Sequence, residues 1–171
     1  MWSQPNLRWV QAALLFAVCG GVSSQLLNGD TWLGYLLPVP FGVLSAWLFV
    51  KGVGPGVVLV VLDIAVWQMA YRLAVHLGAT IDSGRVLFAL CLAGLVGAVG
   101  VTLATALTAR RTPPPGSFAV CALGGALCGL PFAYWQIAGT RALLPDWALA
   151  PLCFAVWQGA VGLCLWRSFR A

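Results

Sequence analysis

Glutamate is absent from this chain, the only acidic residues are four aspartates, and histidine occurs once. Charged residues make up 8% of the 171 residues, whereas about a quarter is usual in soluble domains. So few charged groups cannot cover the surface of a water-soluble protein. Together with 61% hydrophobic residues, this scarcity excludes an ordinary soluble domain and indicates an integral membrane protein.

The same scarcity limits the possible chemistry. The chain contains no H-E-x-x-H, no G-x-S-x-G and no paired carboxylates. A metal or haem site normally needs at least two strong ligands, and a single histidine does not supply them. We therefore expect no cofactor and no metal. An intramembrane enzyme, using His76 with Ser23 or Ser24, ranks third among the functional hypotheses.

All six cysteines lie inside apolar stretches, and none forms a C-x-x-C motif. This placement favours thiols that pack as small hydrophobic side chains. A soft-metal pathway is the alternative, since thiolates suit Cu(I), and it would use Cys91, Cys121, Cys128 and Cys153.

Six apolar segments have about the 20 residues that a membrane-spanning helix requires. They are Trp9–Leu27, Trp32–Val50, Val57–Leu77, Val86–Leu107, Phe118–Ile137 and Trp147–Trp166. The connections between them are short and rich in turn residues, which favours antiparallel neighbours. We expect an all-α integral membrane protein, a compact bundle of six transmembrane helices forming a single domain over residues 1–171. Prolines inside the segments predict kinks or unwound stretches at Pro38, Pro40, Pro131 and Pro151.

Basic residues are distributed unevenly between the connections. With six spans, one side of the membrane collects six basic residues and no acidic one: Arg8, Lys51, Arg110, Arg111, Arg167 and Arg170. The other side holds Asp30, Asp82, Arg85, Arg141 and Asp146. The positive-inside rule then places both termini in the cytoplasm and the chain in the inner membrane as a multi-pass protein. The net charge of +5 reflects this topology, and we expect no nucleic-acid partner.

Polar and aromatic residues gather in the predicted outer half of the bundle. Gln68, Arg72 and His76 follow at i, i+4 and i+8 and therefore share one helix face. A few polar groups among apolar walls are typical of a small-molecule pocket. The predicted ligand-binding residues are Gln25, Asp30, Gln68, Arg72, His76, Tyr134, Trp135 and Gln136. The alternative is that these residues only face the membrane interface, with Arg72 extending to the lipid headgroups.

Asp63 is an ionisable residue in the inner half of its span, and such residues are expensive in a membrane and often functional. Two interpretations remain open. The carboxyl is either protonated and hydrogen-bonded to Ser45, Thr102 or Thr105, or it binds a proton or cation during transport.

Small residues recur at helix-packing spacings. Gly94, Gly97, Gly125 and Gly129 are the predicted helix-packing residues, and Ala13-x-x-x-Ala17 occurs in the first span. These residues pack helices within the bundle or, alternatively, bind another membrane protein or a second copy of the chain.

Six short spans, both termini inside, an outward polar half and Ala13-x-x-x-Ala17 resemble the substrate-binding subunits of energy-coupling-factor transporters. The size and span count are also similar to those of the rod-shape membrane protein MreD. The first resemblance implies an outward-facing substrate pocket, and docking on a transmembrane partner through the alanine motif. The first hypothesis is therefore small-solute binding or transport, and the second is a membrane scaffold or accessory subunit.

Overall fold

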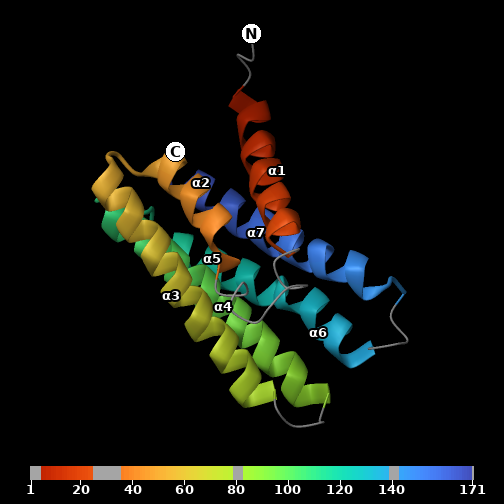
Figure 1. Ribbon diagram of the computed structural model, residues 1–171. Helices are drawn as coiled ribbons and strands as arrows, with labels where there is room; N and C mark the ends of the chain where they lie inside the picture. Colours follow the sequence, from red (N-terminus) through yellow and green to blue (C-terminus); the bar gives the residue numbers. More distant parts are fainter. Residues whose placement is uncertain (1–4, 25–35, 79–82, 139–142, 171) are drawn as a thin grey trace.

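The computed structural model describes residues 5–24, 36–78, 83–138 and 143–170, and every regular element within them is a helix. In chain order the helices are α1 (Pro5–Ser24), α2 (Val39–Phe49), α3 (Val53–Gly78), α4 (Ser83–Ala109), α5 (Ser117–Leu127), α6 (Gly129–Ala138) and α7 (Asp146–Arg170). Figure 1 shows them gathered into one bundle, with α3 and α4 running side by side. The predicted all-α architecture is confirmed for the described residues.

Four stretches among the described residues are long and apolar enough to cross a membrane: Val53–Gly78, Ser83–Ala109, Ser117–Ala138 and Trp147–Phe169. They correspond to the last four of the six predicted spans. Their outward faces are apolar as well, since Val61, Phe88, Leu107 and Leu123 are each more than half exposed. An apolar surface on this scale suits lipid rather than water. The bundle is therefore of a kind that inserts into a membrane.

Two prolines shorten the second predicted span, Trp32–Val50. Among its described residues the α-helix begins only at Val39, directly after Pro38, and Pro40 lies in its first turn. Proline is tolerated there because the first N–H groups of a helix have no partner within it. The resulting 11-residue α2 is about 16 Å long, roughly half of a bilayer core. The last residues of the first predicted span, Trp9–Leu27, lie outside the described residues.

Pro131 divides the fifth predicted span into two helices. α5 ends at Leu127 and α6 begins at Gly129, with Cys128 between them. Because proline has no N–H and its ring crowds the carbonyl four residues earlier, Leu127 loses its regular helical partner. α5 and α6 remain consecutive parts of one apolar stretch of 22 residues, Ser117–Ala138.

Small residues bring α1 and α7 together in antiparallel orientation. Gly20, near the end of α1, contacts the backbone of Phe154 in the first half of α7. Further along, a Cβ built on Gly159 would lie 3.2 Å from the Cβ of Ala17 and 3.3 Å from the carbonyl oxygen of Ala13. The Ala13-x-x-x-Ala17 motif therefore packs against α7 inside the chain. Its use as a docking face for a partner, which the resemblance implied, stays a prediction.

Glycines also set the distance between α4 and the α5–α6 pair. Gly94 and Gly125 face each other so closely that a Cβ on either would collide with the backbone of the other. A Cβ on Gly129 would lie 2.5 Å from a carbonyl oxygen of α4, and one on Gly97 would lie 2.9 Å from the indole of Trp157. All four predicted packing glycines thus make contacts within the chain.

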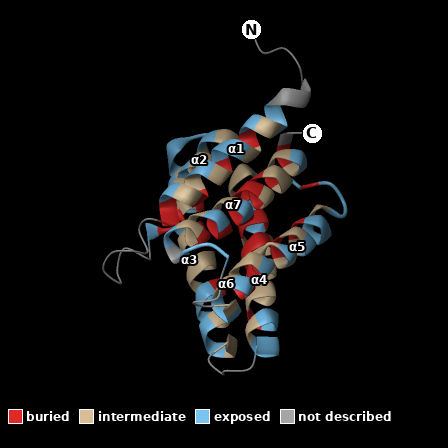
Figure 2. Cartoon of the chain, turned by 90° about the vertical axis from the view of Figure 1, so that its right-hand side faces the viewer, coloured by how far each residue is buried: buried red, intermediate tan, exposed pale blue. Residues whose placement is uncertain are grey.

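The buried core lies where α7 meets α1, α2 and α4. Figure 2 shows the buried residues concentrated there, while the lower ends of α3 and α4 are mostly exposed or intermediate. The core cluster consists of large side chains and a few small ones: Phe16, Phe41, Phe49, Ala98, Val101, Trp157, Val161, Leu165 and Phe169.

One end of the bundle, called here the basic end, collects cationic side chains. Lys51 and Arg111 line the same hollow beside Phe169, and the Arg111 guanidinium donates a 2.8 Å hydrogen bond to the Phe169 carbonyl. Since α1 runs antiparallel to α7, Arg8 lies at the same end as Arg167.

Candidate functional site

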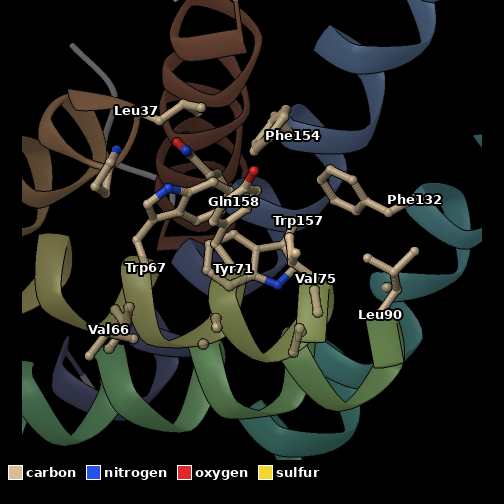
Figure 3. Close-up of a pocket in the computed structure, with 18 of the residues that line it drawn as sticks. Leu37, Val66, Trp67, Tyr71, Val75, Leu90, Phe132, Phe154, Trp157 and Gln158 are labelled. Carbon is tan, nitrogen blue, oxygen red and sulfur yellow. The ribbon is translucent and has the colours of Figure 1, made fainter. Parts of the chain in front are cut away.

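A cavity of about 530 Å³ lies along α3, and it is called here the α3 cavity. Its walls come from α3 and α4 on one side and from α6, α7 and the start of α2 on the other. Figure 3 shows the labelled aromatic side chains and Gln158 gathered between these helices. This volume is within the range of sites that hold small organic molecules.

The α3 cavity runs from the middle of α3 to the turn between α3 and α4. On α3 the lining starts at Asp63 and reaches Gly78, whereas on antiparallel α4 it runs from Val101 back to Val86. Fifteen residues separate Asp63 from Gly78, which corresponds to about 22 Å of helix. Asp63 and Val101 are buried, so their end of the cavity is called here the deep end, and the opposite end, at the partly buried Gly78 and Val86, is called here the mouth.

Aromatic rings form most of the wall around the deep half. Trp67 stacks on Tyr71, with ring centroids 6.5 Å apart, and contacts Phe154 at 5.5 Å. On the opposite wall, Phe41 and Trp157 have centroids 6.2 Å apart. Asp63, Trp67 and Tyr71 share one face of α3 because they are spaced by four residues. The cavity therefore offers several ring faces and edges close to one carboxyl group.

Two polar side chains lie deep in the cavity wall without partners. Asp63 is 1% exposed and Gln158 is 3% exposed. Within the described residues, neither carboxyl oxygen of Asp63 nor Oε1 of Gln158 has a hydrogen-bond partner. A Cβ added to Gly42 would lie 3.0 Å from Oδ2 of Asp63, so the carboxyl packs directly against α2. Buried polar atoms are nearly always hydrogen-bonded, and three unpaired acceptors around one cavity therefore need an explanation.

The hydroxyl partners predicted for Asp63 are engaged elsewhere or unpaired. Thr102 donates to the carbonyl oxygen of Ala98 at 2.8 Å, and Thr105 donates to that of Val101 at 2.9 Å. Serine and threonine in helices commonly turn back to the preceding turn in this way. Ser45 is buried, and its hydroxyl has no partner among the described residues. The predicted hydrogen bonds from Asp63 to these three residues were therefore wrong.

The described residues among those predicted to bind a ligand do not all line one cavity. Trp135 and Gln136 line the α3 cavity, near its mouth. Gln68, Arg72 and His76 are not among the lining residues, and the last two are exposed. The hydroxyl of Tyr134 accepts a 3.0 Å hydrogen bond from the backbone N–H of Leu143 instead. The last two predicted ligand-binding residues, Gln25 and Asp30, lie outside the described residues. A ligand role for this set stays a prediction.

The serines considered as nucleophiles make local hydrogen bonds. Ser23 donates to the carbonyl oxygen of Cys19 and Ser24 to that of Gly21, each at 2.6 Å. Among the described cysteines all six thiols are free. In the described ranges no three His, Cys, Asp or Glu side chains converge on a position where a metal ion could bind.

Sequence reasoning missed Gln158, Trp67, Tyr71 and Phe154 as parts of one site. Gln158 is a lone amide within an apolar span, a signal of the same kind that identified Asp63. Trp67 and Tyr71 lie on the Asp63 face of α3, whereas the predicted ligand-binding residues Gln68 and Arg72 lie on a neighbouring face. Which of these two faces meets α7 depends on tertiary packing and not on the pattern of α3 alone.

Comparisons of the chain with models of known protein families, with curated proteins and with solved structures find no significant match.

Proposed function

We propose that this chain is a membrane protein that binds or transports a small, largely apolar molecule in the α3 cavity. One observation carries the proposal. Asp63 and Gln158 present three buried acceptor atoms without partners to a 530 Å³ cavity lined mainly by aromatic and aliphatic side chains. Apolar walls with a few polar groups that orient the ligand are the usual design of a small-molecule site.

The proposal includes six membrane spans in the inner membrane of the cell. Both termini then lie in the cytoplasm. The gathering of Arg8, Lys51, Arg111 and Arg167 at the basic end supports this orientation, because cytoplasmic connections are enriched in basic residues. In this orientation α2 lies in the second span, and the mouth of the α3 cavity opens to the outside.

The scaffold hypothesis has less support. It relied on glycine-rich helix faces, and Gly94, Gly125 and Gly129 contact other helices of the same chain. Large exposed apolar side chains occur on most helices, and a lipid environment accounts for them without a protein partner.

Filling the cavity tests the proposal. Ala74 lines the cavity. Ala65 lies on the same helix, but it is exposed and is not one of the lining residues. The probe is naphthylethanol, a neutral aromatic alcohol, and binding is measured by equilibrium dialysis against protein in phosphatidylcholine nanodiscs, with empty nanodiscs subtracted. We expect saturable binding to the unmodified protein and a loss of at least about tenfold, roughly 1.4 kcal/mol, in Ala74→Phe.

The matched variant Ala65→Phe adds the same side chain to the lipid-facing side of α3 and is expected to bind as the unmodified protein does. Equal binding in both variants would mean that the probe does not occupy the α3 cavity. Absence of saturable binding, together with co-purification of a second membrane protein in fixed ratio, would replace the proposal with the scaffold function.

A further inference from the structure

We propose that the ligand of the α3 cavity is an organic ammonium with an apolar, aromatic-sized body, and that its charged group binds at Asp63. This inference rests on the proposed function, because it assumes that the cavity holds a small molecule. It adds the chemical class of that molecule and the position of its charge.

The charges around the cavity favour a cation. Among the described residues that line the cavity, Asp63 is the only acidic one, and none of them is lysine, arginine or histidine. In the described parts of α2, α4, α6 and α7 the lining therefore brings no basic group to Asp63, and Tyr71 on α3 is the only other titratable residue among the described lining residues. An ionised carboxyl in an apolar interior is very costly unless it is paired. Since no described side chain pairs with it, a ligand cation is the partner that this arrangement lacks.

The unpaired atoms point to a hydrogen-bond donor as well as a positive charge. Both carboxyl oxygens of Asp63 and Oε1 of Gln158 are acceptors without a donor. An ammonium group has only N–H donors and no acceptor, and its hydrogen bonds to a carboxylate are charge-assisted. An anionic ligand would instead bring further acceptors to a site that already has three unpaired ones.

The aromatic wall supplies a second kind of cation recognition. Trp67 follows Asp63 by one turn on the same face of α3, and Phe41 precedes Gly42, which packs against the carboxyl. Trp157 lies beside Phe41. The negative faces of such rings attract ammonium groups within about 6 Å of the ring centre. A cation at Asp63 is therefore close to at least one ring from each of α2 and α3.

The length of the cavity accommodates the rest of the ligand. From Asp63 to the mouth the described lining is mainly apolar and aromatic over about 22 Å of helix. A short polar cation would leave most of this apolar lining without contact, whereas a ligand with an aromatic or aliphatic body would cover it. The geometry thus fits an amphiphilic ammonium with its charge at the deep end.

Three probes with one body and different end groups test the inference. Naphthylethylamine is an ammonium at neutral pH, naphthylethanol is neutral and naphthylpropionate is an anion. Binding is measured by the same nanodisc dialysis, in neutral lipid, so that lipid charge does not favour the cation. In the unmodified protein we expect the ammonium to bind at least about tenfold more tightly than the alcohol, and the carboxylate most weakly.

Substitutions at the carboxyl locate the charge preference. Asp63→Asn keeps the shape of the side chain and removes its charge, so the preference for the ammonium over the alcohol should fall to about twofold or less. Asp63→Glu keeps the charge and should retain most of the preference. The comparison of probes in the unmodified protein needs no variant and stays informative if a substitution prevents folding.

Failure of this inference is distinguishable from failure of the proposed function. If naphthylethanol binds and Ala74→Phe abolishes that binding, but the ammonium binds no better than the alcohol, the cavity is a ligand site for another class of molecule and the cation inference is wrong. If the ammonium preference persists in Asp63→Asn, its origin is elsewhere and the inference is also wrong. If none of the three probes binds saturably, both proposals fail.

Discussion

Single residues decide how closely the helices of this bundle approach one another. Between Gly94 and Gly125 the backbones of α4 and α5 touch where side chains would normally separate them. Helices in lipid gain most of their association energy from such close packing. The contacts of each glycine therefore predict whether the methyl group of an alanine would fit at that position.

Gly125→Ala should destabilise the protein. Its new Cβ would collide with the Gly94 carbonyl and lie 2.5 Å from the Cβ of Ala98, so α4 and α5 must separate. We expect a loss of about 1–3 kcal/mol, the usual cost of overpacking, measured as a lower midpoint of thermal unfolding in detergent by tryptophan fluorescence.

The same substitution at Gly21 is the matched control. A Cβ at Gly21 meets nothing within 4 Å, and alanine is favoured over glycine inside a helix by up to about 1 kcal/mol. Gly21→Ala should therefore leave the midpoint unchanged or raise it slightly. A similar loss in both variants would show that the α4–α5 contact does not determine the effect.

At the residue scale the sequence singled out Asp63 but did not predict the surroundings of its carboxyl group. Asp63 was identified from its depth alone, and the structure leaves it buried and unpaired. Its predicted partners Thr102 and Thr105 bond within α4, as their helical setting allowed. Whether a hydroxyl turns back to its own helix or crosses to a neighbour depends on the distance between helices, which no local pattern encodes.

At the scale of single helices, prolines lie near the boundaries of α2 and α6, and an arginine bonds the last turn of α7. Pro38 and Pro131 were predicted to disturb their spans, and each lies next to a helix boundary. At the end of α7, the last carbonyl groups have no partners within the helix. Arg111, from the connection after α4, bonds the Phe169 carbonyl across 58 residues of sequence. This contact joins the connection after α4 to the last turn of α7 at the basic end.

Arg111→Ala should loosen the last turn of α7. The substitution removes both the hydrogen bond and a cation that favours a helix C-terminus, and its cost should be about 1 kcal/mol because Arg111 is exposed. Hydrogen–deuterium exchange should become faster in the last turn of α7 and remain unchanged in α3. Arg110→Ala is the control, since Arg110 is equally basic, adjacent and exposed. Equal effects of both variants would assign the change to net charge alone.

At the scale of the whole molecule, the apolar runs of the sequence predicted six spans, and the described residues contain four apolar stretches of spanning length, which correspond to the last four of these. The α3 cavity was not predictable in the same way. It exists because Asp63 and Tyr71 on α3 and Trp157 and Gln158 on α7 come together from segments about 90 residues apart. Helical periodicity identifies faces, but it does not say which faces of two distant helices meet.

Cysteine labelling tests the proposed orientation. The six native cysteines are first replaced by alanine. Lys51→Cys then places one exposed thiol just before α3, and Ser83→Cys, in a second variant, places one at the start of α4, at the opposite end of the α3–α4 pair. An impermeant maleimide applied to spheroplasts should label Ser83→Cys and should reach Lys51→Cys only after the membrane is permeabilised. Labelling of both from outside would contradict the orientation, and so would the reverse pattern.

The position of Asp63 along α3 has an electrical consequence. It lies ten residues from Val53, about 15 Å along the helix axis, which in the proposed orientation places it near the middle of the hydrocarbon core. A monovalent cation that reaches it from the outer mouth crosses roughly half of the transmembrane voltage. The full voltage is worth about 2.3 kcal/mol per charge at 100 mV, so half of it, about 1.2 kcal/mol, would favour occupancy roughly sevenfold. In an energised, inside-negative membrane the resting potential would therefore concentrate the proposed ligand at the centre of the protein.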